Sequence, residues 1–367
     1  MNADQHPSSL LHPDWIALIQ DTALSSENQG KLHPDLLELI YQQGWFKLFV
    51  PSVYGGQERT LPEVVKLEEA LSWADGSLGW VVTLCSGAGW FGGFLSPSLA
   101  HEIFSRKDVC LAGSGAVSGT ATKTENGFRI NGTWKYASGA LHATIFTVNC
   151  VLMDEGGPIL DTSGNQLVRS FILFQDEVHI LPKWKTIGLK ATASHSFEVK
   201  DLEVKEERFF EININRLVTK DPLYQYPFLQ LAEVTLAVNS SGMALRFLEL
   251  AEEILSRRIK NEQLSSYQRN ALLQTLKSVK ERFAGVRHEF YEALEGSWFS
   301  YQEGKLDSAV LTKVSQTSRQ LAQVARVCVD DLYPFCGLIA ANPDALINRF
   351  WRDIHTASQH SLLTFSQ

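Results

Sequence analysis

The stretch NGTWKYASGALHATIF, residues 131–146, marks a place where one β-strand ends and another begins. Trp134 and Tyr136 belong to a β-rich run, and a Ser-Gly step at Ser138 interrupts it. Serine and glycine both favour turns, so a plain β-turn accounts for the pattern. A flat aromatic cofactor lying against the strand edge accounts for it as well, because such a site would use the small hydroxyl of Ser138.

The chain around this stretch falls into three zones of different hydrophobic periodicity. Residues 14–104 read as helices joined by Gly/Pro loops, with helices from Pro34 to Gly44 and from Pro62 to Gly76. Short β-rich runs follow, and after them apolar residues recur at helical spacing. The order predicts an α+β protein. Its predicted domains are an N-terminal helical domain (1–107), a central, mostly antiparallel, barrel-like β-domain (108–211) and a C-terminal helical bundle (212–367).

Composition excludes several classes of protein. The net charge is −8 and no Lys/Arg-rich run is present, so a nucleic-acid partner is not expected. Five cysteines without a CxxC motif predict reduced thiols and a cytoplasmic location, and the N-terminus does not resemble a signal peptide. Residues 77–100 carry no charge and are long enough to span a membrane, but their glycines and Pro97 predict a buried helix and loop instead.

Five stretches, in order, resemble the acyl-CoA dehydrogenase superfamily of flavoproteins, and the resemblance runs from about residue 27 to residue 360. They are KLHPDLLELIYQQGWFKLFVPSVYGG (31–56), ADGSLGWV (74–81), GFRINGTWKYASG (127–139), GLKATASHSFEVKDLEV (188–204) and RFWRDIHTASQH (349–360). In that family they correspond to the first helices and their loop, a helix under the flavin, a hairpin at the flavin ring, a strand pair, and a loop that closes over the flavin. The resemblance implies that fold, with a C-terminal four-helix bundle.

The last of these stretches separates two branches of the superfamily. In the dehydrogenases proper, a glutamate nine residues after the loop arginine removes the substrate α-proton; counting from Arg352 reaches Ser361, which is no base at neutral pH. Glu233 falls close to an alternative position of that base, although an ordinary exposed helix glutamate is the commoner explanation. The stretch WRDIHTASQH instead resembles flavin-dependent monooxygenases of the same fold, the oxygenase components of two-component systems.

This resemblance implies a mechanism and two catalytic residues. Such proteins take reduced FMN or FAD from a separate reductase, form a C4a-hydroperoxyflavin with O₂, and act on a small hydrophobic or aromatic substrate. Their serine near flavin N5 matches Ser138, and their histidine near C4a matches His360. A hydroxyl that holds the N5 proton contributes about 1 kcal/mol, and more in a dry site, which amounts to roughly tenfold in the lifetime of the oxygenated flavin. Beside an anionic peroxide we expect the charged form of His360 to be favoured.

Other positions receive weaker assignments. The resemblance implies further cofactor-binding residues, namely Leu111, Ala112, Gly113, Ser114, Tyr136, Trp184 and His355. His355 and His360 are five residues apart, which does not suit a metal pair, so no metal is predicted.

Arg352 and Asp353 are expected to form a structural ion pair or to anchor the loop, and His142 is either a pocket residue or a surface histidine. Aromatic hydroxylases of this group carry a phenol-activating histidine where TLCSGAGWFGGFL (83–95) has none, so we expect a substrate that needs no deprotonation.

Two other functions and one assembly state complete the expectations. The alternatives are an FAD-dependent acyl-CoA dehydrogenase with a non-standard base, and an inactive scaffold that only binds a ligand or partner. Two apolar stripes exceed what one antiparallel neighbour would cover, and the resemblance implies flavin sites completed across subunits, so a homotetramer is expected. The stripes are Leu272, Leu276, Val279, Phe283, Val286 and Phe290, and Leu311, Val314, Leu321, Val324 and Cys328.

Overall fold

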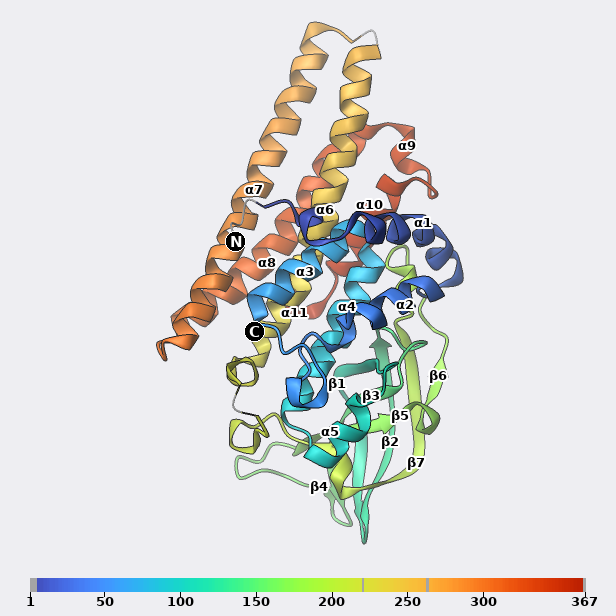
Figure 1. The fold of residues 1–367 in the computed structure, drawn as a ribbon, viewed down its shortest axis with the longest axis vertical. Helices are drawn as coiled ribbons and strands as arrows, with labels where there is room; N and C mark the ends of the chain where they lie inside the picture. The colour runs from blue at the N-terminus through green and yellow to red at the C-terminus, as the bar shows by residue number, and fades with distance from the viewer. Residues whose placement is uncertain (1–4, 220, 262–263, 366–367) are drawn as a thin grey trace.

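The computed structural model describes residues 5–219, 221–261 and 264–365, in which helices, a β-sheet and further helices follow one another (Figure 1). The first helices are α1 (Pro13–Gln29), α2 (Pro34–Gln43), α3 (Leu61–Ala74), α4 (Gly76–Gly89) and α5 (Pro97–Phe104). The strands are β1 (Leu111–Thr124), β2 (Gly127–Ala137), β3 (Ile145–Asp154), β4 (Gly157–Pro158), β5 (Val168–Phe174), β6 (His179–Leu181), β7 (His195–Lys205) and β8 (Phe209–Phe210). The last helices are α6 (Phe228–Asn261), α7 (Ser266–Gln302), α8 (Ser308–Leu332), α9 (Leu338–Ala341), α10 (Leu346–Ala357) and α11 (Ser361–Thr364). The predicted α+β class is confirmed, and the domain boundaries stay a prediction.

Local sequence explains one of the two helix ends that were predicted. Gly44 ends α2 in the left-handed conformation, with φ of 64°. The second end differs, because α3 stops at Ala74 and Gly76 begins α4 instead, with Asp75 capping the Leu78 amide at 2.9 Å. A Cβ at Gly76 would lie 2.9 Å from Asp353 Oδ2, so this glycine allows α4 and α10 to pack closely.

The sheet contains an opening between two of its central strands. Its order is β6-β7-β2-β1-β3-β5-β8, and β1 and β3 are parallel while the other pairs are antiparallel. β1 pairs with β2 only from Gly119 onward, and the last part of β2, up to Ala137, pairs with β7 alone. The N-terminal half of β1 therefore has no strand on its β2 side. Trp134 closes the lower end of this gap, where its indole lies against Gly119.

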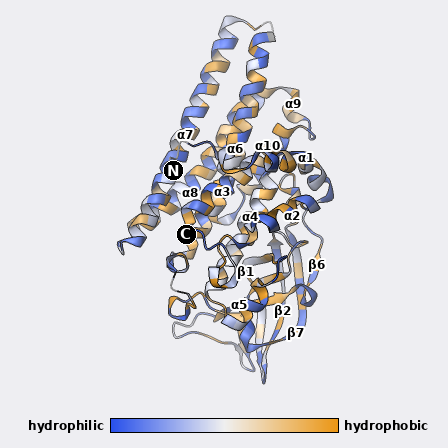
Figure 2. Cartoon of the chain, in the orientation of Figure 1, coloured by the Kyte–Doolittle hydropathy of each residue, from blue (hydrophilic) through white to orange (hydrophobic). Residues whose placement is uncertain are grey.

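Three long helices, α6, α7 and α8, and the shorter α10 form the C-terminal bundle, and α6 and α7 extend beyond the rest of the molecule (Figure 1). Hydrophilic and hydrophobic residues alternate along α6 and α7 (Figure 2). The predicted stripes turn inward: Leu272, Phe283 and Leu321 are each at most 7% exposed. These stripes are covered within one chain, so they no longer support an oligomer.

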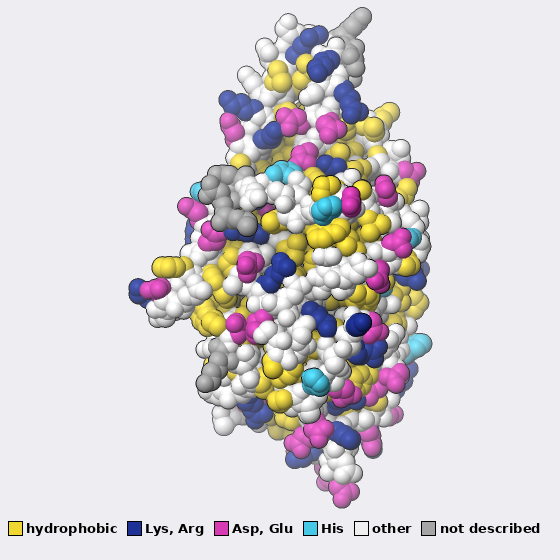
Figure 3. Space-filling view, viewed as in Figure 1, with side chains coloured by type: hydrophobic (Ala, Val, Ile, Leu, Met, Phe, Trp, Pro, Cys, Tyr) yellow, Lys and Arg dark blue, Asp and Glu magenta, His cyan; other side chains and the backbone are white. Residues whose placement is uncertain are grey.

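Residues 77–100 form α4, a 3-10 turn and α5, and most of their side chains are buried, as predicted. No helix in the described ranges combines the length and the hydropathy needed to cross a bilayer. All five cysteines are free and buried. On the described surface shown in Figure 3, acidic and basic side chains are interspersed around a band of hydrophobic ones, without the broad basic area that nucleic-acid binding requires.

Candidate active site

Three segments far apart in the sequence meet at Trp80 of α4. Its indole Nε1 donates a hydrogen bond to Ser138 Oγ at 3.2 Å, just beyond the end of β2. Its ring also lies edge-on to the His360 ring, with 6.0 Å between the centroids. Ser138 is only 6% exposed, so its hydroxyl sits in a largely dry environment. The structure therefore brings both predicted catalytic residues, Ser138 and His360, next to one aromatic side chain.

The Ser-Gly step has a conformational reason. Gly139 has φ of 78°, a value that side chains with a Cβ rarely adopt, and a Cβ there would lie 2.7 Å from Cys85 Sγ of α4. Its amide donates to the Thr192 carbonyl at 2.8 Å. Glycine at this position thus lets the end of β2 pass close to α4 and places the preceding hydroxyl of Ser138 beneath Trp80.

His360 lies at the start of α11 and caps it. Its Nδ1 accepts a hydrogen bond from the Leu362 amide at 3.4 Å, so the neutral ring carries its proton on Nε2. Burial lowers the pKa of His360 below its ordinary value. The expectation of a charged ring concerned a site that holds an anionic peroxide, and it stays a prediction; in the protein alone, burial favours the neutral form.

The predicted cofactor-binding stretch of β1 lies along the opening in the sheet. Leu111 and Ala112 are buried, whereas Gly113 and Ser114 are half-buried in the part of β1 that has no pairing with β2. Backbone groups along such a strand edge can hydrogen-bond a ligand. Together with the Ser138 hydroxyl, this edge fits a flat ring that carries donors and acceptors on its rim, as a flavin does.

Tyr136 and Trp184, two further predicted cofactor contacts, lie against each other beside this opening. Their ring centroids are 6.2 Å apart in an edge-to-face arrangement, and Tyr136 is 70% exposed. A bulge in the β2–β7 pairing gives Tyr136 a positive φ of 63° and turns its side chain outward. Trp184 Nε1 donates to the Leu189 carbonyl at 2.9 Å, which ties this wall to the turn before β7.

His355 does not share the surroundings of His360. Its Nδ1 donates to the Trp351 carbonyl at 2.6 Å, and its Nε2 pairs with Asp330 of α8 at 2.9 Å. Both ring nitrogens are therefore engaged, which leaves neither for the predicted flavin contact. His355 joins α10 to α8 and has a structural role, because α10 ends at Ala357 and the chain turns before His360.

Arg352 and Asp353 act as anchors and do not pair with each other. Arg352 binds Glu27 of α1 at 2.5 Å and the Ile187 carbonyl at 2.6 Å. Asp353 accepts from the Leu189 amide at 2.6 Å, and burial together with Asp75 raises the pKa of Asp353 to about 7. Of the two predicted roles, loop anchoring is the one observed, and α10 thereby holds the turn that carries Leu189.

His142 is half-buried and acts as a hydrogen-bond acceptor within the fold. Its Nε2 accepts a hydrogen bond from the Leu32 amide at 3.2 Å, which links the turn after β2 to the loop between α1 and α2. Burial, and to a smaller extent the charge of Lys31, lowers the pKa of His142 to about 4. The ring is therefore neutral at pH 7 and serves as a structural acceptor.

Glu233, the candidate base of the dehydrogenase alternative, is only 1% exposed on α6. One of its oxygens accepts from Arg319 at 2.7 Å, and the other accepts from the Ser315 hydroxyl. The explanation of Glu233 as an exposed helix glutamate is wrong, because α6 is covered by α8 on this side. Both carboxylate oxygens are occupied, so the structure offers no free base at this position.

Sequence reasoning missed three residues of the site. Trp80 was part of a quoted motif without an assigned role, and Thr192 and Ser194 lie in another, before β7. Ser138 Oγ lies 2.8 Å from Ser194 Oγ, which lies 2.7 Å from Thr192 Oγ1. The available signal was chemical: a buried indole N–H needs an acceptor, and buried hydroxyls need partners.

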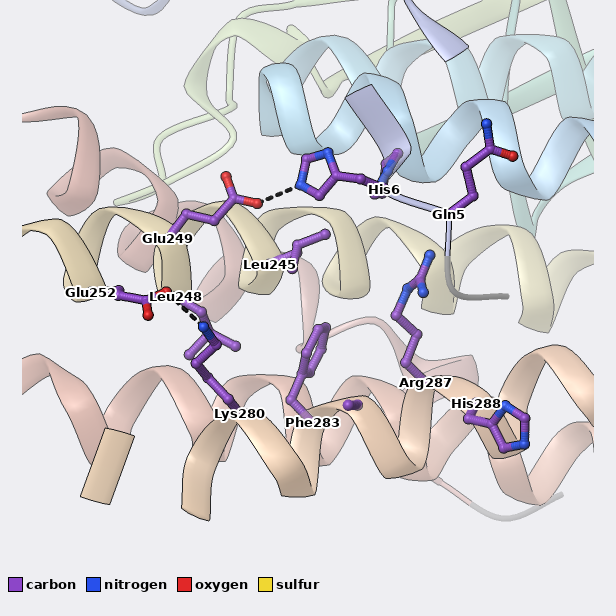
Figure 4. A pocket seen from close by; sticks show the side chains of 12 residues that line it. Gln5, His6, Leu245, Leu248, Glu249, Glu252, Lys280, Phe283, Arg287 and His288 are labelled. Atoms are coloured by element: carbon purple, nitrogen blue, oxygen red, sulfur yellow. Dashed lines mark hydrogen bonds and ion pairs between the residues drawn. The ribbon is translucent and has the colours of Figure 1, made fainter. Parts of the chain in front are cut away.

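A cavity lies between the N-terminal segment, α6 and α7 (Figure 4). Its charged side chains are matched with one another or with neighbours. His6 pairs with Glu249 at 2.6 Å and Lys280 with Glu252 at 2.6 Å, as the dashed lines in Figure 4 mark, while Arg287 pairs with Glu69. Groups satisfied in this way do not converge on a reacting atom, so we assign the chemistry to the site around Trp80.

Comparison with known proteins shows what the chain is similar to. Residues 234–365 match the family described as acyl-CoA dehydrogenase, C-terminal domain. The indole-3-acetate monooxygenase of Acinetobacter baumannii is 25% identical over 358 residues, which span 94% of this chain and 88% of that protein. The flavin-dependent monooxygenase oxygenase subunit HsaA of Mycobacterium tuberculosis is 24% identical over 94% of this chain and 88% of its own.

Solved structures show the same fold. The crystal structure of HsaA from M. tuberculosis has a TM-score of 0.86 at 20% sequence identity and covers 96% of this chain and 93% of its own. XiaF from Streptomyces sp., in complex with FADH2 and glycerol, has a TM-score of 0.83 at 21% identity. The match covers 95% of this chain and 89% of the XiaF chain. The predicted resemblance is confirmed. The chain therefore has the acyl-CoA dehydrogenase fold and is similar to flavin-dependent monooxygenases that share it.

Proposed function

We propose that the protein is the oxygenase component of a two-component flavin-dependent monooxygenase. It would take reduced flavin from a separate reductase and use O₂ to hydroxylate a small hydrophobic or aromatic compound. The observation that carries this proposal is the meeting of Ser138 and His360 at Trp80, beside the opening between β1 and β2. The names of the relatives support it: one is an oxygenase subunit and another acts on indole-3-acetate.

The residues present suit a bound flavin. Residues 111–114 of β1 would hold the edge of its ring, Tyr136 and Trp184 would flank it, and Ser138 would accept a hydrogen bond from it. Bound reduced flavin supplies the two electrons with which one atom of O₂ enters the substrate and the other leaves as water. Support for this cofactor comes from XiaF, which was solved with FADH2.

The protein's own groups then have separate tasks. His360 holds a proton at Nε2. It can donate this proton to the oxygen atom that leaves as water. Trp80 keeps Ser138 in place and covers it from water. The face of α4 that continues from Trp80 is apolar and excludes water from the reaction, which limits the unproductive release of hydrogen peroxide.

The test is to mix the purified protein, under anaerobic conditions, with reduced FMN or FAD, and then to add ¹⁸O₂ together with a panel of indoles, phenols and thiophene-type heterocycles. We expect ¹⁸O in one of the products and tighter binding of reduced than of oxidised flavin. Tightly held oxidised FAD that is bleached by an acyl-CoA would contradict the proposal and would support the dehydrogenase. An absence of affinity for flavin in both redox states would contradict it too, and would support the scaffold.

We infer that the substrate lies along α4. Leu84, Gly87 and Ala88 follow Trp80 on the same face of the helix and are only partly buried. A Cβ at Gly87 would meet no atom within 4 Å, so open space borders the helix here. No charged side chain occurs within α4, which suits the predicted substrate that needs no deprotonation.

Replacing Gly87 with leucine should fill this space. We expect kcat/KM for a bulky substrate to fall at least tenfold, because a pocket that has lost the volume of a side chain rejects a ligand by about 1–3 kcal/mol. The melting temperature should not fall, since leucine is the better helix former. Gly285→Leu on α7, where open space also surrounds the glycine, is the matched control and should leave kcat/KM unchanged. If kcat/KM were the same in both variants, the substrate would not bind along this face of α4.

The remaining expectations are also proposals. A homotetramer is still proposed on the resemblance alone, and no longer on the stripes. Light scattering at micromolar concentration should detect an oligomer, and a monomer would contradict it. A cytoplasmic location is supported by the five free thiols.

A further inference from the structure

Three buried hydroxyl groups form a chain that leads away from the site. Ser138 Oγ lies 2.8 Å from Ser194 Oγ, Ser194 Oγ lies 2.7 Å from Thr192 Oγ1, and Thr192 Oγ1 donates to the Leu189 carbonyl at 2.8 Å. The three side chains are at most 6% exposed, so water does not compete for these bonds. The backbone holds both ends together, because the Gly139 amide donates to the Thr192 carbonyl.

The carbonyl at the end sets the direction of every bond in this chain. A carbonyl only accepts and a hydroxyl has a single proton, so Thr192 spends its proton on Leu189. Thr192 must then accept from Ser194, and Ser194 must accept from Ser138. The proton of Ser138 is therefore committed to Ser194, and one of its two lone pairs is taken by Trp80 Nε1–H. What Ser138 offers to a ligand is one lone pair and no proton.

Leu189 is held firmly in this orientation. Its φ of 51° is unusual for a residue with a Cβ, and its carbonyl also accepts from Trp184 Nε1 at 2.9 Å. Its amide donates to Asp353 of α10 at 2.6 Å. The terminal carbonyl cannot turn away without breaking these contacts, so the direction of the hydroxyl chain is built into the packing of the β-sheet against α10.

We propose that Thr192 and Ser194 are positioning residues that make the site select reduced over oxidised flavin, an inference that rests on the proposed function. Reduced flavin carries a proton on N5 and can donate it, whereas N5 of oxidised flavin is an acceptor. A Ser138 hydroxyl that can only accept forms a hydrogen bond with N5–H of reduced flavin. Against oxidised flavin the lone pair of Ser138 faces the lone pair of N5, and no hydrogen bond forms. The oxygenase thereby holds the reduced flavin that its reductase delivers and releases the oxidised flavin after the reaction.

The test compares the dissociation constants of reduced and oxidised flavin, measured under anaerobic conditions, in four proteins. Thr192→Val and Ser194→Ala each free a proton in the chain, so that Ser138 can turn and donate to oxidised flavin. We expect the preference for reduced flavin to shrink about tenfold in both, which lowers the two-electron potential of the bound flavin by about 30 mV. Thr192→Ser keeps the hydroxyl and should keep the parent's preference and potential.

The possible results distinguish a failure of this inference from a failure of the proposed function on which it rests. If the parent prefers reduced flavin and Thr192→Val and Ser194→Ala keep that preference unchanged, the hydroxyl chain does not set it and the inference is wrong. If Thr192→Val is poorly folded, Ser194→Ala, which removes a single buried hydroxyl, gives the answer alone. If the parent protein binds neither redox state of FMN or FAD, the proposed function itself fails and the inference fails with it.

Discussion

Replacement of His360 by alanine is expected to lower hydroxylated product by about a hundredfold or more, because a positioned acid typically contributes about 10²–10⁴-fold. His360 is neutral in the buried site and presents its Nε2–H beside Trp80. Without that proton, reduced flavin and O₂ should still be consumed, and hydrogen peroxide should appear in place of product. The measurement is the ratio of product to peroxide per flavin oxidised.

Two further variants distinguish chemistry from structure. His360→Asn keeps an acceptor that can cap α11, so it should fold and bind flavin like the parent but lose product as the alanine variant does. His355→Ala removes the pair with Asp330, which lies near the surface, and should cost little stability and little activity. If His360→Asn retained full product yield while His355→Ala lost it, the catalytic histidine would be assigned to the wrong position.

Replacement of Arg352 by methionine should lower the free energy of unfolding by up to about 3–5 kcal/mol, since it leaves the largely buried Glu27 carboxylate with Lys190 as its remaining charged partner. Arg352 contacts Glu27 through both carboxylate oxygens and also donates to the Asn348 side chain and the Ile187 carbonyl. The last contact holds the turn that carries Leu189, so affinity for flavin should fall as well. Chemical denaturation and flavin titration measure the two effects.

The pH dependence of this variant follows from Glu27. Burial works to raise the pKa of Glu27, but the hydrogen bonds and charges of Arg352 and Lys190 outweigh it and leave the pKa below the ordinary value. The stabilisation is therefore present above about pH 4.5 and is lost as pH falls through the lowered pKa. Arg352→Met, which keeps only the Lys190 contribution, should show a smaller loss.

A double variant and a surface control complete the experiment. Arg352→Met combined with Glu27→Leu removes the stranded charge and should recover much of the stability. Arg129→Met, which removes an exposed pair with Glu203, should change stability little. If Arg352→Met were as stable as Arg129→Met, the buried pair would not anchor α10.

Local features of the sequence predicted much of this architecture. The start of the β-rich zone near residue 108, the end of α2 at Gly44 and the Ser-Gly step after β2 all depend on local sequence, and each is observed. The sequence-based predictions were wrong where the burial of a residue depends on a helix that is distant in the sequence. Glu233 is buried because α8 covers α6, and the stripe on α7 is covered by the same helix. A helical period shows which face is apolar but not how many neighbours it meets.

The site divides in the same way. By itself the sequence determined the order of the three zones, the turn that carries Ser138 and the loop that carries His360, because these depend on local backbone preference and on recognisable motifs. Only the tertiary structure decided that Trp80 joins the two, that His355 turns to Asp330, and that Ser138 is left as an acceptor. The reason is that the direction of a hydrogen-bond chain depends on the group that ends it. Here that group is the Leu189 carbonyl, which contacts from α10 and from Trp184 hold in place.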